Sequence, residues 1–432
     1  MNFPQSLRYL DELIEMGIKV GLDHTRALAG ALGDPQRSFP SVIVGGTNGK
    51  GSTAAYLAAI LQGAGYRTGL FTSPHLVDVR ERVRVNGRII GKEDFAEAAS
   101  RLRATAETAM GSGLLEGYPT YFEALTLMGF LHFMRERVEA GVLEVGLGGR
   151  LDCTNIADPL VSVVTNVGRD HEEWLGKGVL RIAREKAGIF RPGVPALTAA
   201  SGPRVLSLLR REAERLGTRL LPLSDCQVSV GTKGWRMVCG RDSLDLPLPV
   251  LPGGHQVDNA ALAVRCCWVL RQLGWHLPDE SIREGIAGAK WPGRLELAVR
   301  SPETYFDGAH NPDGCRALAR WVAGRPEGRR ALVFTAMKDK PIGVMARLLF
   351  PSFGRVWATA VPMARCARPE TIRHRSRGLV TDLAEDPGEA LAAARRWAGS
   401  DGLVVAAGSL YLVGYLKSSL EEADPLSWGS GL

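Results

Sequence analysis

A glycine-rich segment with one lysine and two hydroxyl side chains follows an apolar, β-branched run early in the chain. The segment spans residues 45–53 and reads GGTNGKGST. Glycines let backbone N–H groups turn inward onto a polyphosphate, a lysine supplies positive charge, and a serine or threonine hydroxyl can reach Mg²⁺. We therefore expect a phosphate-binding loop carrying Lys50 and Ser52 between a strand and a helix.

This segment departs from the strict pattern G-x-x-x-x-G-K-[ST]. Val44 stands at the position of the first glycine, and Gly51 separates Lys50 from Ser52. The loop alone therefore names no reaction. An ordinary glycine-rich turn between a strand and a helix is the alternative interpretation.

Polar side chains lie at the ends of three other apolar runs. Ser73 follows residues 67–71, Glu144 ends an apolar run, and His171 follows residues 161–167. The carboxyl ends of parallel strands meet at one edge of a sheet, so these groups are expected near the phosphate loop. With phosphate oxygens, a hydroxyl, a carboxylate and an imidazole can complete the octahedral shell of Mg²⁺. A lone histidine there is more often structural, but a carboxylate in an apolar strand requires a cation nearby.

The elements that must position these groups alternate between strand-like and helix-like patterns. Such alternation is typical of a mostly parallel sheet with helices on both faces. The predicted strands are residues 41–44, 67–71, 141–145, 161–167 and 195–198. The predicted helices are residues 5–16, 53–64, 92–110, 121–137, 180–187, 201–216 and 256–273.

A second α/β alternation begins after the helical pattern stops at Trp291-Pro292-Gly293. Its predicted strands are residues 304–306, 330–334, 355–360 and 402–406. Residues 220–251 show short alternating runs, which predict a small antiparallel excursion. We therefore predict an α/β fold with a P-loop-type, mostly parallel sheet domain over residues 1–293. A second, smaller α/β domain is predicted over residues 294–432.

Length and composition fit this architecture and narrow the class of protein. A chain of 432 residues favours two domains. The net charge is +7 without a dense basic block, which argues against nucleic-acid binding. The longest apolar run, residues 124–134, is too short to cross a bilayer, and no secretory signal is visible. Seven cysteines without a spacing pattern indicate reduced thiols in a cytoplasmic protein. We also expect a monomer with no membrane partner.

A series of motifs in order along the chain resembles the folylpolyglutamate synthase/dihydrofolate synthase family, within the Mur-ligase-type amide ligases. The motifs are GTNGKGST (46–53), SPHL (73–76), ERVRVNG (81–87), TYFE (120–123), EVGLGGRLD (144–152), REKAGI (184–189), PGR (292–294), FDGAHNP (306–312) and GSLY (408–411). Any one motif can arise by chance, whereas the whole series in family order identifies the resemblance.

The resemblance implies roles for individual residues. The implied ATP contacts are Gly49, Lys50, Gly51, Ser52, Asn259, Arg294 and Asp307. The implied catalytic residues are Lys50, His171, Lys186 and His310. The implied metal ligands are Ser52, Ser73, Glu144, His171 and Lys186, the last matching a lysine that the family carbamylates. The implied substrate contacts are Thr120, Tyr121, Phe122, Glu123, Leu151, Asp152 and Cys153. Thr120 and Glu123 also fit a helix capping box, and both explanations can hold.

The activity that the resemblance implies is ATP-dependent ligation of L-glutamate through an acyl phosphate. The acceptor would be dihydropteroate, folate (poly)glutamates or both, so that a bifunctional dihydrofolate synthase/folylpolyglutamate synthase is expected. ATP and two Mg²⁺ ions would take part, with Lys186 carbamylated. The expected partners are small molecules only: dihydropteroate or a reduced folate, L-glutamate and ATP.

Two positions depart from the family pattern. Arg169 replaces an apolar residue before the Asp-His pair, and Cys153 replaces a small residue in the pterin-contacting segment. These departures leave open the alternative that the protein is a relative of the family with drifted specificity. A Mur-type ligase acting on a cell-wall nucleotide precursor and a nucleotide-dependent switch without ligase turnover also stay open.

Overall fold

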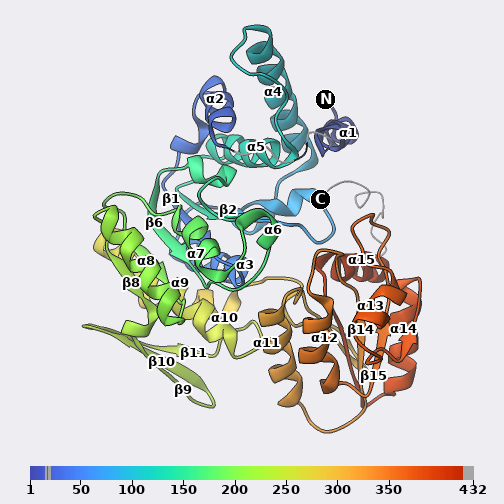
Figure 1. Cartoon of the computed structure of the whole chain (residues 1–432). Helices are drawn as coiled ribbons and strands as arrows, with labels where there is room; N and C mark the ends of the chain where they lie inside the picture. The colour runs from blue at the N-terminus through green and yellow to red at the C-terminus, as the bar shows by residue number, and fades with distance from the viewer. Residues whose placement is uncertain (15–16, 18–20, 422–432) are drawn as a thin grey trace.

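The computed structural model describes residues 1–14, 17 and 21–421 and has a two-domain α/β fold (Figure 1). In the described part of the chain, the larger domain is built on an eight-stranded sheet of order β4-β3-β2-β5-β1-β6-β7-β8. Its strands are β1 (Ser41–Gly45), β2 (Thr68–Phe71), β3 (Val83–Val85), β4 (Arg88–Ile89), β5 (Ala140–Glu144), β6 (Pro159–Val164), β7 (Ala196–Thr198) and β8 (Leu220–Pro222). All neighbours pair in parallel except β3, which pairs antiparallel with β2 and β4.

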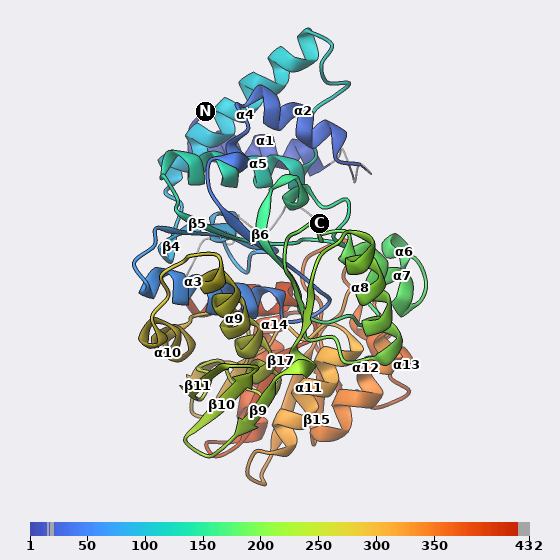
Figure 2. The same cartoon turned by 90° about the vertical axis from the view of Figure 1, so that its left-hand side faces the viewer.

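Helices cover both faces of this sheet (Figure 2). One layer contains α1 (Phe3–Ile14), α2 (Asp23–Ala31), α4 (Lys92–Gly111) and α5 (Tyr121–Arg135). The opposite side carries α3 (Lys50–Gly63), α9 (His255–Gln272) and α10 (Asp279–Gly288), while α6 (Glu172–Leu175), α7 (Val179–Ala187) and α8 (Pro203–Arg215) lie beside β6 to β8. Every residue of β1 is buried, as a parallel strand covered on both faces must be.

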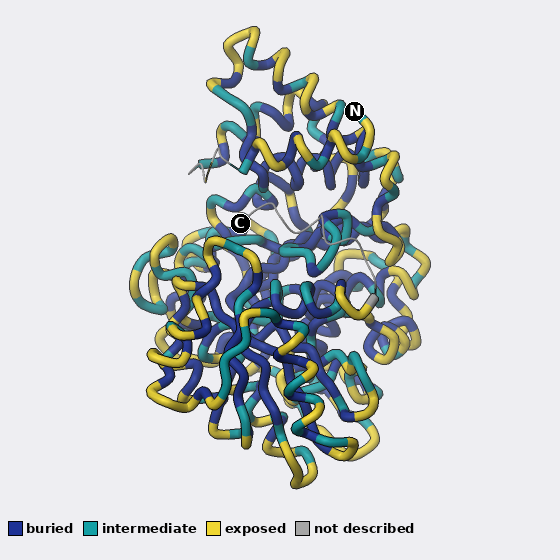
Figure 3. The backbone as a smooth tube through the Cα atoms, turned by 90° about the vertical axis from the view of Figure 1, so that its right-hand side faces the viewer, coloured by how far each residue is buried: buried dark blue, intermediate teal, exposed yellow. Residues whose placement is uncertain are grey.

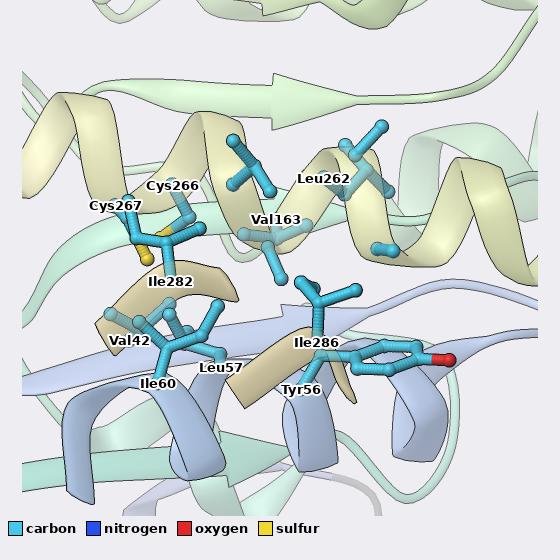
Figure 4. Close-up of a cluster of buried hydrophobic side chains, with 14 of the residues drawn as sticks. Val42, Tyr56, Leu57, Ile60, Val163, Leu262, Cys266, Cys267, Ile282 and Ile286 are labelled. Atoms are coloured by element: carbon cyan, nitrogen blue, oxygen red, sulfur yellow. The ribbon is translucent and has the colours of Figure 1, made fainter. Parts of the chain in front are cut away.

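The core between the sheet and α3, α9 and α10 is the part that fixes the phosphate loop. Figure 4 shows Ile60 and Leu57 of α3 meeting Ile282 of α10 and Val42 of β1. Ile60 and Ile282 are completely buried. Figure 3 shows the same pattern along the described residues, with buried segments inside and exposed loops outside. Helix α3, which begins at the phosphate loop, therefore packs on a layer of buried apolar side chains.

The predicted antiparallel excursion is present in the described residues as the three-stranded sheet β11-β10-β9. It contains β9 (Gln227–Val230), β10 (Gly234–Cys239) and β11 (Asp242–Pro247). Its inner face carries Trp235 and Met237, which are buried in the same core as α9. The excursion begins later than predicted, because β8 still belongs to the large parallel sheet.

The smaller domain is built, within the described residues, on a six-stranded sheet of order β12-β13-β17-β14-β15-β16. Its strands are β12 (Glu296–Arg300), β13 (Glu303–Phe306), β14 (Arg330–Phe334), β15 (Arg355–Ala358), β16 (Asp382–Leu383) and β17 (Leu403–Ala407). Its helices are α11 (Pro312–Ala323), α12 (Ile342–Leu349), α13 (Pro369–Arg375), α14 (Pro387–Ala398) and α15 (Leu410–Glu421). Among these described strands only the edge strand β12 pairs antiparallel, which makes this sheet mostly parallel as well.

Several element boundaries differ from the sequence prediction. The helix after the phosphate loop begins at Lys50, so Lys50 and Ser52 lie in its first turn. Helices α2 and α10 and the β3–β4 hairpin are absent from the prediction, because each is short and lacks a long periodic pattern. The predicted end of the first helix at residue 16 lies outside the described residues.

A close approach between α3 and α10 generates a test of this core. A Cβ placed on Gly285 would lie 2.7 Å from Ile60 N and 2.8 Å from Ile60 Cα, which are backbone atoms. Because backbone cannot yield as a side-chain tip can, Gly285→Ala should lower the free energy of unfolding by about 1–3 kcal/mol. Thermal unfolding of the variant would measure the change.

The matched control lies one turn later on the same helix. A Cβ on Gly288 would meet no atom within 4 Å. Gly288→Ala should therefore leave the melting temperature unchanged or raise it slightly, since alanine favours helix. Equal melting temperatures for the two variants would contradict the close contact between α3 and α10.

Candidate active site

The phosphate loop is held in place by residues that follow β6. Gly49 caps the start of α3 with φ of 82°, a conformation that favours glycine. Thr165 Oγ1 donates a hydrogen bond to Asn48 O (2.6 Å), and Asn48 N donates to Asn166 Oδ1 (2.8 Å). A Cβ at Gly46 would lie 1.9 Å from Thr165 Oγ1, so the two segments touch without room for a side chain. The loop is thus preformed with its backbone anchored.

Two lysines reach this loop from different helices. Lys50 Nζ donates to Thr47 O at 3.2 Å, and Lys186 Nζ, at the end of α7, donates to Gly46 O at 2.7 Å. The Lys186 side chain belongs to a residue only 4% exposed. Burial and the neighbouring positive charge of Lys50 lower the pKa of Lys186 to about 7. Lys186 is therefore present as a neutral amine in a large fraction of molecules at neutral pH.

Glu144 ends β5 beside the same loop. Its carboxylate is buried, and Oε2 accepts a hydrogen bond from Ser73 N at 3.2 Å. Burial raises the pKa of Glu144, whereas the charge of Lys50 lowers it in part. Ser73, at the end of β2, therefore meets Glu144 through its backbone, as the strand-end argument predicts. The arrangement leaves a buried carboxylate facing a cationic loop.

The two domains meet at Asp170, in the loop after β6. Lys340, which precedes α12 of the smaller domain, places Nζ 2.7 Å from Asp170 Oδ1. Asn311 Nδ2 donates to Asp170 Oδ2 at 3.1 Å, and His310 Nε2 lies 3.5 Å from the same oxygen. Burial by itself raises the pKa of Asp170, but His310, His171 and Lys340 lower it far below its usual range. A buried carboxylate and a buried ammonium thus join the domains.

His171 lies next to this contact and is partly exposed. It precedes α6 in a left-handed conformation with φ of 52°. Burial and the nearby positive charges lower its pKa to about 4, so its ring is neutral at neutral pH. A neutral imidazole is the form that binds a metal ion. His310 is oriented by its own loop, with Nδ1 2.8 Å from Gly308 O.

The protein side chains alone do not form a complete metal site. Among the described residues, no group of three or more His, Cys, Asp and Glu side chains gathers closely enough to hold a metal ion. The oxygen donors present are the Glu144 carboxylate and the Ser52 hydroxyl at the phosphate loop. These donors fit a hard divalent cation that also takes phosphate oxygens, as Mg²⁺ does.

The implied ATP contacts outside the phosphate loop lie in two places. Asn259 belongs to α9, and Arg294 and Asp307 belong to the second domain. Asn259 Nδ2 donates to Gln256 Oε1 at 2.9 Å, and Gln256 Nε2 donates to Ser52 Oγ at 3.4 Å. A Cβ on Gly49 would lie 2.2 Å from Asn259 Oδ1, which places α9 directly against the phosphate loop. Asn259 therefore lies against the phosphate loop, and its contact with ATP stays a prediction.

The carboxylate of Asp307 binds backbone N–H groups of its own domain. Its two carboxylate oxygens accept hydrogen bonds from Leu295 N (3.0 Å) and Ala309 N (2.9 Å). Arg294 Nη1 donates to Gly293 O at 3.0 Å and sits so close to Gly308 that a Cβ there would lie 2.3 Å away. Asp307 therefore fixes the backbone on either side of this contact, next to Arg294.

A second cluster lies above the sheet, where α5 begins. Thr120 and Glu123 form the predicted capping box, with Thr120 N donating to Glu123 Oε2 at 2.8 Å. Thr25 Oγ1 donates a hydrogen bond to Glu123 Oε1 (2.8 Å), and His24 Nδ1 lies 2.9 Å from the same oxygen. Burial opposes ionisation, but the His24, Thr120 and Thr25 hydrogen bonds bring the pKa of Glu123 to about 2. Glu123 is therefore an ionised and fully engaged carboxylate.

The remaining predicted substrate contacts surround this cluster. Asp152 caps the short helix after it and accepts from Thr154 N (3.0 Å) and Leu147 N (2.8 Å). Cys153 Sγ lies 3.8 Å from Thr25 Oγ1, which links it to Glu123. Tyr121 and Phe122 follow the cap, and Leu151 packs against the same core. The structure therefore brings the two predicted segments together.

Sequence reasoning missed five residues of these clusters. They are His24, Thr25, Asp170, Gln256 and Lys340. Lys340 could have been found, because it follows a predicted strand of the second domain just as Ser73 and His171 follow strands of the first. Nothing in the pattern around His24 signals its contact with Glu123, since the two lie 99 positions apart.

Comparison with known proteins decides the family. The Mur ligase middle domain profile matches residues 44–201, and the Mur ligase glutamate ligase domain profile matches residues 293–410. The dihydrofolate synthase/folylpolyglutamate synthase of Bacillus subtilis is 34% identical over 417 residues, covering 94% of this chain and 96% of its own. The chain belongs to the folylpolyglutamate synthase/dihydrofolate synthase family.

Solved structures of folylpolyglutamate synthase/dihydrofolate synthases share the whole fold. Escherichia coli FolC in complex with DHPP and ADP matches with a TM-score of 0.89 and 32% identity, covering 98% of both chains. A bifunctional enzyme of this family with Mn, AMPPNP and L-glutamate bound matches with a TM-score of 0.87 and 31% identity, again covering 98% of each chain. The synthase fold therefore extends over both domains of this chain.

The Asp170–Lys340 pair gives a stability test for the contact between the domains. Both side chains are at most 8% exposed. Asp170→Asn would leave the buried ammonium without its nearest carboxylate, so the free energy of unfolding should fall by about 3 kcal/mol. Chemical denaturation of the purified variant would measure the loss.

Asp245→Asn is the control for removal of a charge. Asp245 pairs with Arg236 at 2.8 Å, but its side chain is 72% exposed. Water already screens such a pair, so the change should be below about 1 kcal/mol. Equal losses in the two variants would show that burial of the Asp170–Lys340 pair contributes nothing.

Proposed function

We propose that this protein ligates L-glutamate to dihydropteroate, to folate (poly)glutamates or to both, at the expense of ATP. The observation that carries the proposal is the convergence of Lys50, Lys186 and Glu144 at a phosphate loop that faces His310 and Lys340 of the second domain. Charge for a transferring phosphoryl group is gathered at the loop, and the second domain adds the His310 imidazole and the Asp170–Lys340 pair beside it.

The ligands of the solved relatives support the same reaction. One of those structures holds DHPP and ADP, and the other holds Mn, AMPPNP and L-glutamate. A nucleotide, a divalent cation, a pteridine-type acceptor and the incoming amino acid are the components that this ligation needs. We assign ATP to the loop around Gly49, Lys50, Gly51 and Ser52, with Asn259, Arg294 and Asp307 supporting it.

The proposed substrate subsite is the cluster around Glu123. Thr120, Tyr121, Phe122 and Glu123 and the segment Leu151, Asp152 and Cys153 would contact the acceptor. Because Glu123 already receives hydrogen bonds from Thr25 and His24, we assign it the task of shaping the subsite. Cys153 lies at the surface of this cluster, where its side chain can alter the choice of acceptor.

The residues proposed to hold Mg²⁺ are Ser52, Ser73, Glu144, His171 and Lys186. The ion would neutralise charge on the phosphate oxygens and orient them. We expect two ions, as the sequence resemblance implies. Glu144 would provide a carboxylate oxygen and Ser52 a hydroxyl, both at the phosphate loop.

The chemistry proceeds in two displacements. The acceptor carboxylate attacks the γ-phosphorus of ATP, ADP leaves, and an acyl phosphate forms. The amine of L-glutamate then attacks the acyl carbon, phosphate leaves with the electrons of the carbon–oxygen bond, and the new amide nitrogen loses one proton to solvent. Lys50 stabilises the transferring phosphoryl group. His310 and Lys340 face the second step from the smaller domain, and closure of that domain excludes water that would hydrolyse the intermediate.

Carbamylation of Lys186 is part of the proposal. The neutral amine attacks CO₂, a nitrogen–carbon bond forms, and one proton passes to solvent. The product is an anion, so the repulsion between Lys186 and Lys50 becomes attraction. The lowered pKa of about 7 supplies the neutral amine that this step requires.

Lys186→Ala should lower the rate of ligation at least about a hundredfold, because a negative ligand at the metal is lost. Added short-chain carboxylates should restore part of the rate in this variant. Steady-state rates with and without acetate would measure the effect. Full activity of Lys186→Ala without acetate would reject the carbamate role. A loss of activity that acetate does not restore would also count against the carbamate and would indicate that Lys186 acts only through the charge of its amine.

The function itself is tested by phosphate release with ATP, Mg²⁺ and L-glutamate, in separate reactions with dihydropteroate and tetrahydrofolate. We expect release with both acceptors and a mass gain of one glutamate in each product, with Lys50→Ala inactive but folded. A gain with one acceptor would assign a single activity. Release with neither acceptor would favour a drifted relative, for which Arg169 and Cys153 are the first positions to revert.

A Mur-type ligase and a nucleotide switch predict different outcomes in that assay. A Mur-type ligase would ignore both pteridine acceptors and use a cell-wall nucleotide precursor, whereas a nucleotide switch would hydrolyse ATP without regard to glutamate. The match over nearly the full length of a folate ligase favours the folate acceptor over both. The domain boundary near residue 294, the monomeric state and the cytoplasmic location stay predictions. No helix among the described residues is long and apolar enough to span a membrane.

A further inference from the structure

Two cysteines face each other on the small antiparallel sheet, far along the chain from the motifs of the active site. The β9–β10 ladder pairs Val230 with Trp235 and continues to Gln227 with Val238. One further step in this register places Cys226 opposite Cys239. Residues directly opposite in an antiparallel ladder have Cα atoms about 4.5 Å apart in non-hydrogen-bonded pairs and about 5.5 Å apart in hydrogen-bonded pairs. Both spacings fall within the separation of about 4.4–6.8 Å between the Cα atoms of disulfides.

The side chains follow the backbone register. Cys226 Sγ and Cys239 Sγ lie 2.6 Å apart, and both residues pack against the hydrophobic core that includes residues of α9. Both residues are half-buried, whereas Cys266, Cys267, Cys315 and Cys366 are buried. A small reagent in solvent can therefore reach this pair.

An arginine is directed at both sulfurs. Arg265 of α9 is 7% exposed, and its Nη1 contacts Cys226 Sγ and Cys239 Sγ. Its Nε has no hydrogen-bond partner, and in the described part of the chain no carboxylate forms an ion pair with it. A buried guanidinium requires a negative partner. The groups in contact with this guanidinium are the two cysteine sulfurs, so it would stabilise a thiolate that forms at either one.

The cation also affects the reactivity of the pair. The pKa of Cys226 is raised overall, because burial outweighs the charge and the hydrogen bond of Arg265, which offset part of the rise, and the adjacent Asp225 adds to it. The thiolate, not the thiol, attacks disulfides. Arg265 therefore promotes thiol–disulfide exchange at a site where burial alone would suppress it.

We propose that Cys226 and Cys239 form a reversible cross-strand disulfide by exchange with a low-molecular-mass disulfide, with Arg265 as the activating cation. One cysteine thiolate attacks a sulfur of the small disulfide, which breaks its S–S bond and releases one small thiolate. The second cysteine loses its proton to solvent and attacks the mixed disulfide, releasing the second small thiolate. Two electrons pass from the protein to the small disulfide, and the two released thiolates take up two protons.

The test uses the reduced full-length protein incubated with oxidised glutathione. We expect the intact mass to fall by the mass of two hydrogen atoms, a peptide map to join Cys226 to Cys239, and dithiothreitol to reverse both. Cys226→Ser and Cys239→Ser should each stop at a glutathione adduct. Cys153→Ser removes a half-buried cysteine that has no opposite partner in the described sheets and should leave the cross-link unchanged. A different cross-link, or stable adducts on the wild-type pair, would overturn the proposal.

Arg265→Met and Arg265→Lys separate the role of charge from that of packing. Loss of the cation should raise the thiol pKa by about one unit, which lowers the thiolate fraction about tenfold while nucleophilicity rises about threefold. The cross-link in Arg265→Met should therefore form about threefold more slowly, and Arg265→Lys should stay near the wild-type rate. Equal rates in all three proteins would overturn the role of Arg265. If Arg265→Met does not fold, the serine variants still decide whether the disulfide forms.

Discussion

Burial of Lys186 beside the charge of Lys50 at one glycine-rich loop is the constraint on which the charge balance of the site depends. Lys50 and Lys186 both donate to carbonyl oxygens of the loop, and burial together with the charge of Lys50 makes the cationic form of Lys186 less favourable. The buried carboxylate of Glu144 and the ionised Asp170 oppose this positive charge from two sides. A polyphosphate would complete the balance, so the protein is preorganised for its arrival.

The phosphate loop and the cluster around Glu123 are stabilised by different means. The loop is fixed by backbone contacts to the residues after β6 and by the apolar core that packs against α3. The cluster around Glu123 instead relies on one carboxylate, whose oxygens accept hydrogen bonds from α2 and from the start of α5. The two ring nitrogens of His24 lie 2.9 Å from Glu123 Oε1 and 2.9 Å from Gly117 O, so the ring links the carboxylate to the backbone before α5.

The parts of the fold that the sequence predicts are those with local causes. The parallel sheet, the capping box at Thr120 and the convergence of Ser73 and Glu144 follow from hydrophobic patterns and from strand ends. The contacts of Glu123 with His24 and of Asp170 with Lys340 do not, because they join segments about 100 or more positions apart that carry no shared pattern. The Cys226–Cys239 pair also needed the register of the ladder, which one residue of slip would destroy.

The contact between the domains includes a reciprocal pair of amides. Asn48 Nδ2 donates to Asn311 Oδ1 at 3.2 Å, and Asn311 Nδ2 donates to Asn48 Oδ1 at 2.8 Å. Each amide uses a donor and an acceptor at once, so each side chain is complementary only to another amide in this place. One member belongs to the phosphate loop and the other to the cap of α11. The two domains therefore carry matching halves of one recognition element, and a chimaera assembled from two ligases would join correctly only when both halves are kept together.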